Sequence, residues 1–261
     1  MKKVTMLCGL LLALSASIAS ASGVGLKWNS CAGDGGATNK AFACASNAGS
    51  NLLVGTFALD PAGPGLANVS GNEVIIDLAS ADPVLPAWWQ MFKLGTCRQA
   101  SLSMNFVISA LAVNCLDWAQ AQSAGGIGAY NIGQRGPNTA RIIAALAVPP
   151  SALQNLVGGQ EYFSFNVLIN HLKTVGTGLC DGCQTPVCIV FNSVNLTTPI
   201  LANNVKLSGP GNGTDSDYAT WQGGAGVVVN PPPPGSPPVS GCPQATPTKN
   251  ATWSQVKALY R

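Results

Sequence analysis

Hydrophobic and polar residues alternate most clearly between residues 161 and 173. Every second position over this segment carries an apolar side chain, namely Phe163, Phe165, Val167 and Ile169. A period of two is typical of a β-strand that buries one face. The apolar run 187–196 follows, so the two segments predict neighbouring strands joined by a loop that carries cysteines.

Further strands are predicted for short apolar segments bounded by Gly, Pro, Asn or Asp, which favour turns. These segments are residues 52–59, 73–78, 101–109 and 141–148. Only residues 116–123 and 151–157 favour helices, of about two turns each. One long helix over 141–157 is the alternative reading, but Pro149 and Pro150 would break it in the middle.

Many short strands separated by turn signals predict an all-β fold. We expect an antiparallel β-sandwich of the jelly-roll or immunoglobulin-like kind. A parallel α/β sheet is disfavoured because the long crossover helices that it requires are missing.

The order of these segments divides the chain into four parts. Residues 1–21 precede a β-sandwich body at 22–230, a proline-rich linker at 231–241 and a short C-terminal tail at 242–261. A run of prolines favours an extended, semi-rigid spacer.

The tail can form one short amphipathic helix. Thr252 is a suitable N-cap, and Trp253, Val256 and Tyr260 would share a face. A helix this short is marginal by itself, so we expect an ordered tail to dock onto a surface.

Residues 1–21 have the organisation of an export signal. Lys2 and Lys3 supply the positive start, an apolar stretch covers 6–18, and small residues at 19–21 predict cleavage before Ser22. The stretch is too short for a bilayer core of about 30 Å, and no later segment is long and apolar enough to span one. We therefore expect a secreted, extracellular or cell-surface protein.

Composition narrows the class of protein further. Charged residues make up only 9% of the 261 residues, with 13 Lys and Arg against 10 Asp and Glu, while Gly numbers 30 and Pro 18. A coiled coil needs charged, strong helix formers, and a disordered chain combines low hydrophobicity with high charge. The absence of a Lys/Arg cluster also argues against a nucleic-acid partner.

Nine cysteines are present, and Cys8 lies in the predicted signal. The remaining eight are Cys31, Cys44, Cys97, Cys115, Cys180, Cys183, Cys188 and Cys242. An even number in an oxidising compartment predicts four disulfides.

The cluster at 180–188 leaves two other readings open. Three thiolates, with Cys242 as the fourth, have the ligand type of a tetrahedral zinc site, and Cys-x-x-Cys is also a redox motif. Export favours disulfides, because thiols outside the cytoplasm oxidise. Of 105 pairings, we expect Cys31–Cys44, Cys97–Cys115, Cys183–Cys188 and Cys180–Cys242.

The same region carries a resemblance to short secreted bacterial proteins. These share a Cys-x2-Cys-x4-Cys loop, here at 180–188, and the element Thr-Trp-Gln-Gly-Gly, here at 220–224. They also end in Trp-x2-Val-Lys-x-Leu-Tyr-Arg, here at 253–261. The resemblance covers roughly the final 100 residues at the level of motifs. It implies a bacterial, extracytoplasmic protein, and it brings neither an activity nor catalytic residues.

Residues for catalysis are sparse. His171 is the single histidine, it shares the parity of the strand that begins at 161, and it is expected at the rim of the sheet. A catalytic histidine needs a nucleophile and an orienting carboxylate, and no Gly-x-Ser-x-Gly elbow is present. We therefore expect no catalytic residues and no enzyme activity.

Two weaker candidate sites concern ligands. Trp88, Trp89 and Trp221 are candidates for stacking on a sugar ring, although large aromatic side chains are more often core residues. Asp215 and Asp217 place oxygen ligands at alternate positions, as in a calcium loop, but Asp and Asn also simply form turns. Apart from this calcium alternative, we expect no cofactor.

Two functions remain from the sequence. The first is a non-catalytic secreted protein with a structural, adhesive or assembly role and a protein partner. The second is a carbohydrate-binding module or a glycan hydrolase. The sequence leaves the oligomeric state undetermined.

Overall fold

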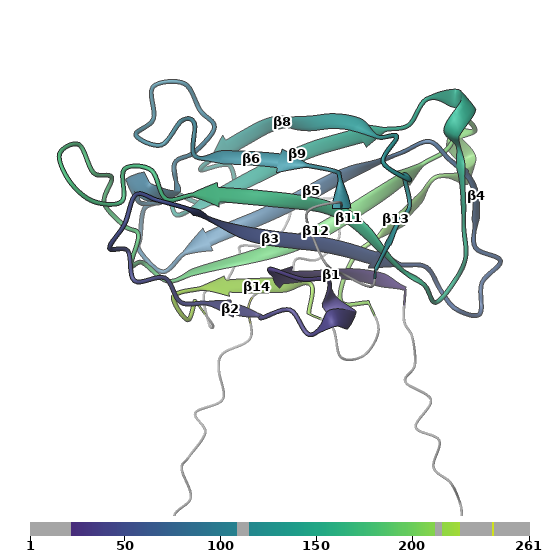
Figure 1. Ribbon diagram of the computed structural model, residues 1–261, viewed down its shortest axis with the longest axis horizontal. Helices are drawn as coiled ribbons and strands as arrows, with labels where there is room; N and C mark the ends of the chain where they lie inside the picture. The colour runs from purple at the N-terminus through teal and green to yellow at the C-terminus, as the bar shows by residue number, and fades with distance from the viewer. Residues whose placement is uncertain (1–21, 109–114, 212–215, 225–241, 243–261) are drawn as a thin grey trace, which may run out of the picture.

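The computed structural model describes residues 22–108, 115–211, 216–224 and 242, and it consists mostly of β-strands (Figure 1). The predicted all-β class is confirmed at that level. The predicted signal at 1–21, the linker at 231–241 and the tail after Cys242 lie outside the described residues.

A five-stranded sheet has β3 and β11 at its centre. Its strands, in order, are β1 (Gly23–Trp28), β3 (Ser50–Ala58), β11 (Glu161–Asn170) and β6 (Leu102–Asn105), with β7 (Leu116–Asp117) also paired to β11. All of these pairs are antiparallel except β11–β7, which is parallel.

A seven-stranded sheet has β12 and β5 at its centre. Its strands, in order, are β2 (Asn39–Lys40), β14 (Tyr218–Trp221), β12 (Val187–Thr197), β5 (Gly71–Ser80), β9 (Thr139–Ala147) and β8 (Ala124–Ile132), with β13 (Val205–Leu207) also paired to β12. A separate ribbon pairs β4 (Leu66–Val69) with β10 (Gln154–Leu156). The β14–β2 pair is parallel, so both large sheets are mixed rather than purely antiparallel as predicted.

Side chains of the two large sheets meet in one hydrophobic core. Phe165 of β11 and Phe191 of β12 lie edge to face, with ring centroids 4.9 Å apart. Val167 and Ile169 join them from β11, as the alternation at 161–173 predicts. Phe163 does not, because a β-bulge between Phe163 and Phe165 turns it into a second cluster with Cys31 and Cys115.

The six strands predicted from the sequence are present, with shifted ends. The predicted pairing of 161–173 with 187–196 is wrong, because β11 and β12 belong to different sheets. The loop between them crosses from one sheet to the other instead of forming a hairpin.

Both predicted helices are wrong. Residues 116–123 form β7 and a turn, and residues 151–157 form the short 3₁₀ turn η4 (Pro150–Ala152) followed by β10. The other described 3₁₀ turns are η1 (Ala32–Asp34), η2 (Ala87–Trp89) and η5 (Leu201–Asn203). These segments are two turns long at most, and strand partners far away in the sequence decide their conformation.

The eight cysteines after Cys8 form four disulfides, but the predicted pairing is wrong throughout. The pairs are Cys31–Cys115, Cys44–Cys183, Cys97–Cys180 and Cys188–Cys242, separated by 84, 139, 83 and 54 residues. The prediction favoured nearby cysteines, whereas the sheets bring distant loops together. Closing long loops restricts the unfolded chain more than closing short ones.

Candidate functional site

The seven-stranded sheet has an outer face, which we define as the side turned away from the shared core. On β5, Val74, Ile76 and Leu78 point into the core. The alternate positions Glu73, Ile75, Asp77 and Ala79 therefore lie on the outer face. This face carries a buried polar network, a groove and a disulfide.

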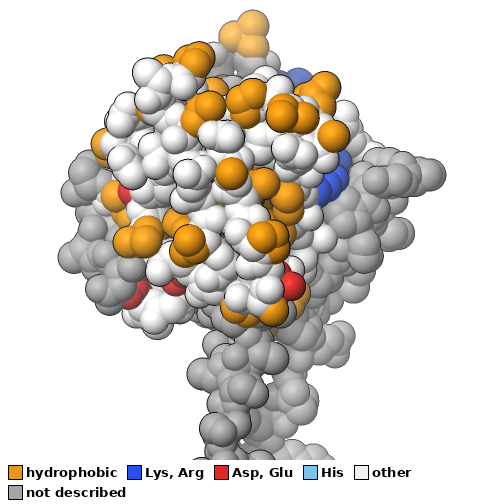
Figure 2. All heavy atoms as spheres, turned by 90° about the vertical axis from the view of Figure 1, so that its right-hand side faces the viewer, with side chains coloured by type: hydrophobic (Ala, Val, Ile, Leu, Met, Phe, Trp, Pro, Cys, Tyr) orange, Lys and Arg blue, Asp and Glu red, His pale blue; other side chains and the backbone are white. Residues whose placement is uncertain are grey.

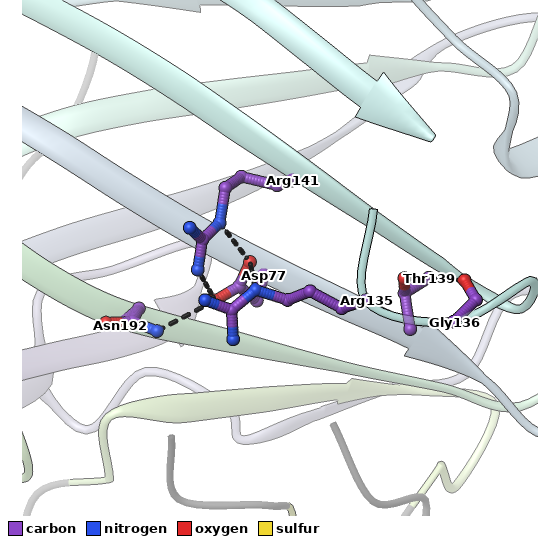
Figure 3. Close-up of polar contacts among 6 residues, drawn as sticks. All are labelled: Asp77, Arg135, Gly136, Thr139, Arg141 and Asn192. Atoms are coloured by element: carbon purple, nitrogen blue, oxygen red, sulfur yellow. Dashed lines mark hydrogen bonds and ion pairs between the residues drawn. The ribbon is translucent and has the colours of Figure 1, made fainter. Parts of the chain in front are cut away.

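The polar network is centred on Asp77, whose side chain is 1% exposed. Arg141 lies directly opposite on β9, and its Nε and Nη2 donate to the two carboxylate oxygens at 2.6 and 2.8 Å. Arg135, from the loop between β8 and β9, places its Nε 3.7 Å from Asp77 Oδ1. Figure 3 shows the carboxylate lying between the two arginines and Asn192.

Asn192 reaches this network because β12 has a β-bulge there. The register shift between Phe191 and Ser193 leaves Asn192 as the extra residue. Its Nδ2 donates to Asp77 Oδ2 at 2.8 Å. Bulges commonly redirect a side chain in this way, so the network ties three neighbouring strands together.

Burial and the carboxylate of Asp77 shift the pKa of Arg135 in opposite directions. Burial lowers the pKa of its guanidinium, and the positive charge of Arg141 lowers it further, while the carboxylate of Asp77 raises it. A bidentate arginine–carboxylate pair with additional hydrogen bonds is the arrangement in which a buried ion pair is tolerated. The network is therefore built to hold strands in place.

A groove of about 500 Å³ lies further along the outer face. Ile75, Ile143 and Ala145 form its apolar floor, and Lys206 from β13 lies at its rim. Glu73, also in its wall, accepts a hydrogen bond from Asn195 Nδ2 at 2.9 Å. The groove is apolar with one charge of each sign.

A disulfide lies on the outer face at the end away from the groove. Cys188 on β12 is joined to Cys242, and both pack with Ala79 and Val190 in a small buried cluster. Residue 242 is thereby fixed to the middle of the sheet, although it follows the predicted proline-rich linker.

The tryptophans predicted for sugar binding are internal. Trp88 and Trp89 from η2 and Trp221 from β14 are all 0% exposed. Their ring centroids lie 5.1 to 5.5 Å apart, with Trp88 stacked on Trp221. Aromatic clusters of this geometry are typical of a core, and none of the three rings is exposed for stacking on a sugar.

Arg98 extends this aromatic cluster. It is 1% exposed, and its guanidinium carbon lies 3.5 Å from the centre of the Trp88 ring. Its nitrogens donate to the backbone oxygens of Leu172, at 3.1 Å, Trp88, at 2.9 Å, and Asn170. Burial lowers the pKa of Arg98 to about 9, so it remains charged at neutral pH. Arg98 therefore holds η2 against the end of β11.

His171 directly follows β11 and is buried rather than at the rim. Its Nδ1 lies 2.6 Å from the carbonyl oxygen of Ala48, which can only accept, so Nδ1 carries a proton. Its Nε2 is 2.8 Å from Asn51 Nδ2 and accepts from it, while the ring stacks on Phe42 at 4.0 Å. Both ring nitrogens therefore hold the end of β11 against the start of β3 and the residues just before it.

The predicted calcium loop lies only partly within the described residues. Asp215 falls outside them, and Asp217 is buried beside β14. Among the described residues, no group of three or more His, Cys, Asp or Glu side chains is arranged to hold a metal ion. In that same part of the chain, no helix has the length and apolarity to cross a membrane.

Sequence reasoning missed Arg98 and the network around Asp77. One signal was available, because Asp77 and Arg141 are charged residues within largely apolar strands of a weakly charged chain. A charge in such a strand is almost always paired. The pairing partner itself depends on which strands are neighbours.

Comparisons of the chain with protein-family models, with curated proteins and with solved structures gave no match.

Proposed function

We propose that this chain is an exported β-sandwich, bacterial in origin, with a non-catalytic structural, adhesive or assembly role outside the cell. The two mixed sheets that share one core support the sandwich. The four disulfides, which are typical of proteins folded in oxidising compartments, support export. The motif resemblance and the predicted signal point the same way.

One observation carries the proposal. The side chains best suited to chemistry are enclosed as packing elements, while large apolar side chains are exposed at the surface. Figure 2 shows the end of the molecule that carries β4, where hydrophobic side chains are spread over an area with few charges. Val157, Ile200 and Leu201 are 61%, 62% and 82% exposed. Leu66 lies beside Ile200 in a small depression of this end.

Exposed apolar side chains in a weakly charged surface favour association with another protein. The test is a pair of matched substitutions in the full chain. Leu201→Asp places a charge within this apolar end of the molecule. The control, Leu94→Asp, adds the same charge at a leucine that lies elsewhere on the surface and is 85% exposed. We expect Leu201→Asp to reduce the amount of protein retained at the cell surface, whereas Leu94→Asp leaves it unchanged. Equal retention of the two variants and the unaltered protein would argue against this surface.

The tail is tested separately, by a chain that ends at Pro243. This variant keeps the Cys188–Cys242 disulfide and removes residues 244–261, which include the predicted docking helix. Unchanged export and surface assembly of the shortened chain would remove the tail from the proposal.

The alternative function, a carbohydrate-binding module or a glycan hydrolase, depended on three tryptophans that are buried in the core. A glycan array probed with the folded protein tests it directly, and strong binding there would replace the assembly role.

A further inference from the structure

β8 is the last strand of the seven-stranded sheet, and its outer edge is open. Among the described residues, β8 pairs with β9 and with no other strand. β6 approaches β8 from the other sheet without hydrogen-bonding to it. Ala124, Gly125 and Gly128 nevertheless remain exposed. An edge of nine residues with unpaired backbone groups is a template for another strand.

The other edges described here are closed or short. The outer edge of β1 is occupied by the chain itself, since Val24 N donates to Gly209 O and Leu26 N to Ser216 O, each at 2.8 Å. β2 and β7 have two residues each, and β13 has three, including Lys206. β6 has four residues. Among the strands of the described residues, only β8 is both long and open.

The sequence of β8 lacks the features that usually protect an edge. It reads Ala-Gly-Gly-Ile-Gly-Ala-Tyr-Asn-Ile and contains neither a charged residue nor a proline. Natural edge strands are commonly blunted by lysine, proline or a bulge, and here only the bulge between Ile127 and Ala129 is present. Small side chains elsewhere on the strand let a second backbone approach closely.

β8 is also held rigidly in place. Tyr130 is buried, and its hydroxyl donates to the backbone oxygen of Trp89. Ile127 and Ile132 pack against the core from the same strand. A rigid edge loses little conformational freedom when a partner strand is added.

We propose that β8 pairs, antiparallel, with β8 of a second copy of this chain. Identical antiparallel strands are related by a two-fold axis, which gives the closed, self-complementary interface of most homodimers. No like charges meet across this pair, because β8 has none. The nearly balanced charge of the chain, 13 basic against 10 acidic residues, also leaves little repulsion between copies.

The test is sedimentation velocity of the purified full chain and of charge variants at the edge. Gly126 and Ala129 lie opposite Ala145 and Ile143 of β9, on the outer face. A Cβ at Gly126 would meet no atom within 4 Å, so the fold has room for a side chain there. We expect the unaltered protein to dimerise. The double variant Gly126→Lys/Ala129→Lys should dimerise roughly tenfold or more weakly, because like charges across a strand pair repel.

A control separates the edge from the face. Ala145→Lys/Ala147→Lys adds the same charge to the same face, one strand further in, at positions that are both exposed. This variant should dimerise like the unaltered protein. Loss of the dimer in the control but not in the edge variant would place the contact on the face and overturn the proposal.

A second edge variant, Gly126→Asp/Ala129→Asp, guards against misfolding. Mixed with the lysine variant, it should form a mixed dimer, which requires both chains to be folded and paired at β8. A monomeric unaltered protein, or folded variants that do not associate when mixed, would overturn the proposal. This inference deepens the proposed assembly role, yet dimerisation in purified protein and retention at the cell surface can fail independently of each other.

Discussion

β1 is an edge strand of the five-stranded sheet, and β8 is an edge strand of the seven-stranded sheet. The two edges differ in how far the rest of the chain covers them. All six residues of β1 are buried, and segments around residues 37, 209 and 216 hydrogen-bond to its outer edge. β8 is longer, largely accessible, and bonded on one side only in the part of the chain that is described. An edge that is neither covered nor charged is available for pairing.

The disulfides follow the same division. Cys31 comes three residues after β1, and its bond to Cys115 holds the following turn against β7. β8 and β9 lie between Cys115 and Cys180, a stretch that contains no cysteine. The Cys31–Cys115 disulfide thus reinforces the closed edge at β1, whereas β8 and β9 carry no disulfide and are held by packing and one ion-pair network. Substitutions can test this division.

The largest effect is expected at the network behind β8. Asp77→Asn removes the charge that Arg141 and Arg135 face, so we expect the free energy of unfolding to fall by about 3–5 kcal/mol. Asp82→Asn, the same change at an exposed residue, should leave it within about 0.5 kcal/mol. Urea denaturation measures both variants. Equal stability of the two would mean that the network does not hold β9 and β8.

The next largest effect is expected at the disulfide beside β1, the closed edge of the five-stranded sheet. Cys31→Ala/Cys115→Ala removes a cross-link that spans 84 residues, which should lower the free energy of unfolding by about 2–4 kcal/mol. Local hydrogen exchange should quicken at β1 before it does at β8. If hydrogen exchange quickens at β8 first, the disulfide does not act mainly on the edge at β1.

One substitution made at both edges compares them directly. At Gly23 in β1, an added Cβ would lie 2.6 Å from the backbone atoms Gly209 O and Gly211 N, so Gly23→Ala should cost about 1–3 kcal/mol. At Gly126 in β8 the space is open. Gly126→Ala should therefore be neutral or stabilise by up to about 1 kcal/mol. Denaturation curves measure the free energy of unfolding of the two variants. Similar losses of stability in both would contradict a difference in packing between the two edges.

The smallest effect concerns the anchor of β8. Tyr130→Phe removes the hydrogen bond to Trp89 and should cost about 1 kcal/mol at neutral pH. Burial raises the pKa of Tyr130, an effect that Arg98 opposes. Its stabilising contribution is therefore complete below the ordinary tyrosine pKa of about 10 and declines as pH rises above it. The stability difference between the two proteins should narrow above that pH, and a constant difference would contradict the burial of the hydroxyl.

Local patterns were sufficient to predict six of the described strands, but not the partners of those strands. The alternation around Phe165, Val167 and Ile169 predicted β11, because a period of two is a local property. Its partners β3 and β6 are more than 50 residues away in the sequence. Which strands become neighbours depends on packing of the whole core, and neither sequence spacing nor turn signals carry that information.

The cysteine pairing and the candidate site failed for the same reason. Cys180, Cys183 and Cys188 lie within nine residues, yet they bond to Cys97, Cys44 and Cys242. β8 itself was overlooked because its glycines weaken the strand pattern. The burial of Trp88, Trp89 and Trp221 likewise depends on two sheets meeting, which the sequence alone does not reveal.

The most direct measurement of β8 pairing is hydrogen exchange on the unaltered protein at a low and a high concentration. The amides of β1 should exchange slowly at both, because the chain itself closes that edge. The amides of β8 that point away from β9 should exchange rapidly in the dilute sample and slowly in the concentrated one. Exchange at β8 that is the same at both concentrations would contradict pairing between two copies.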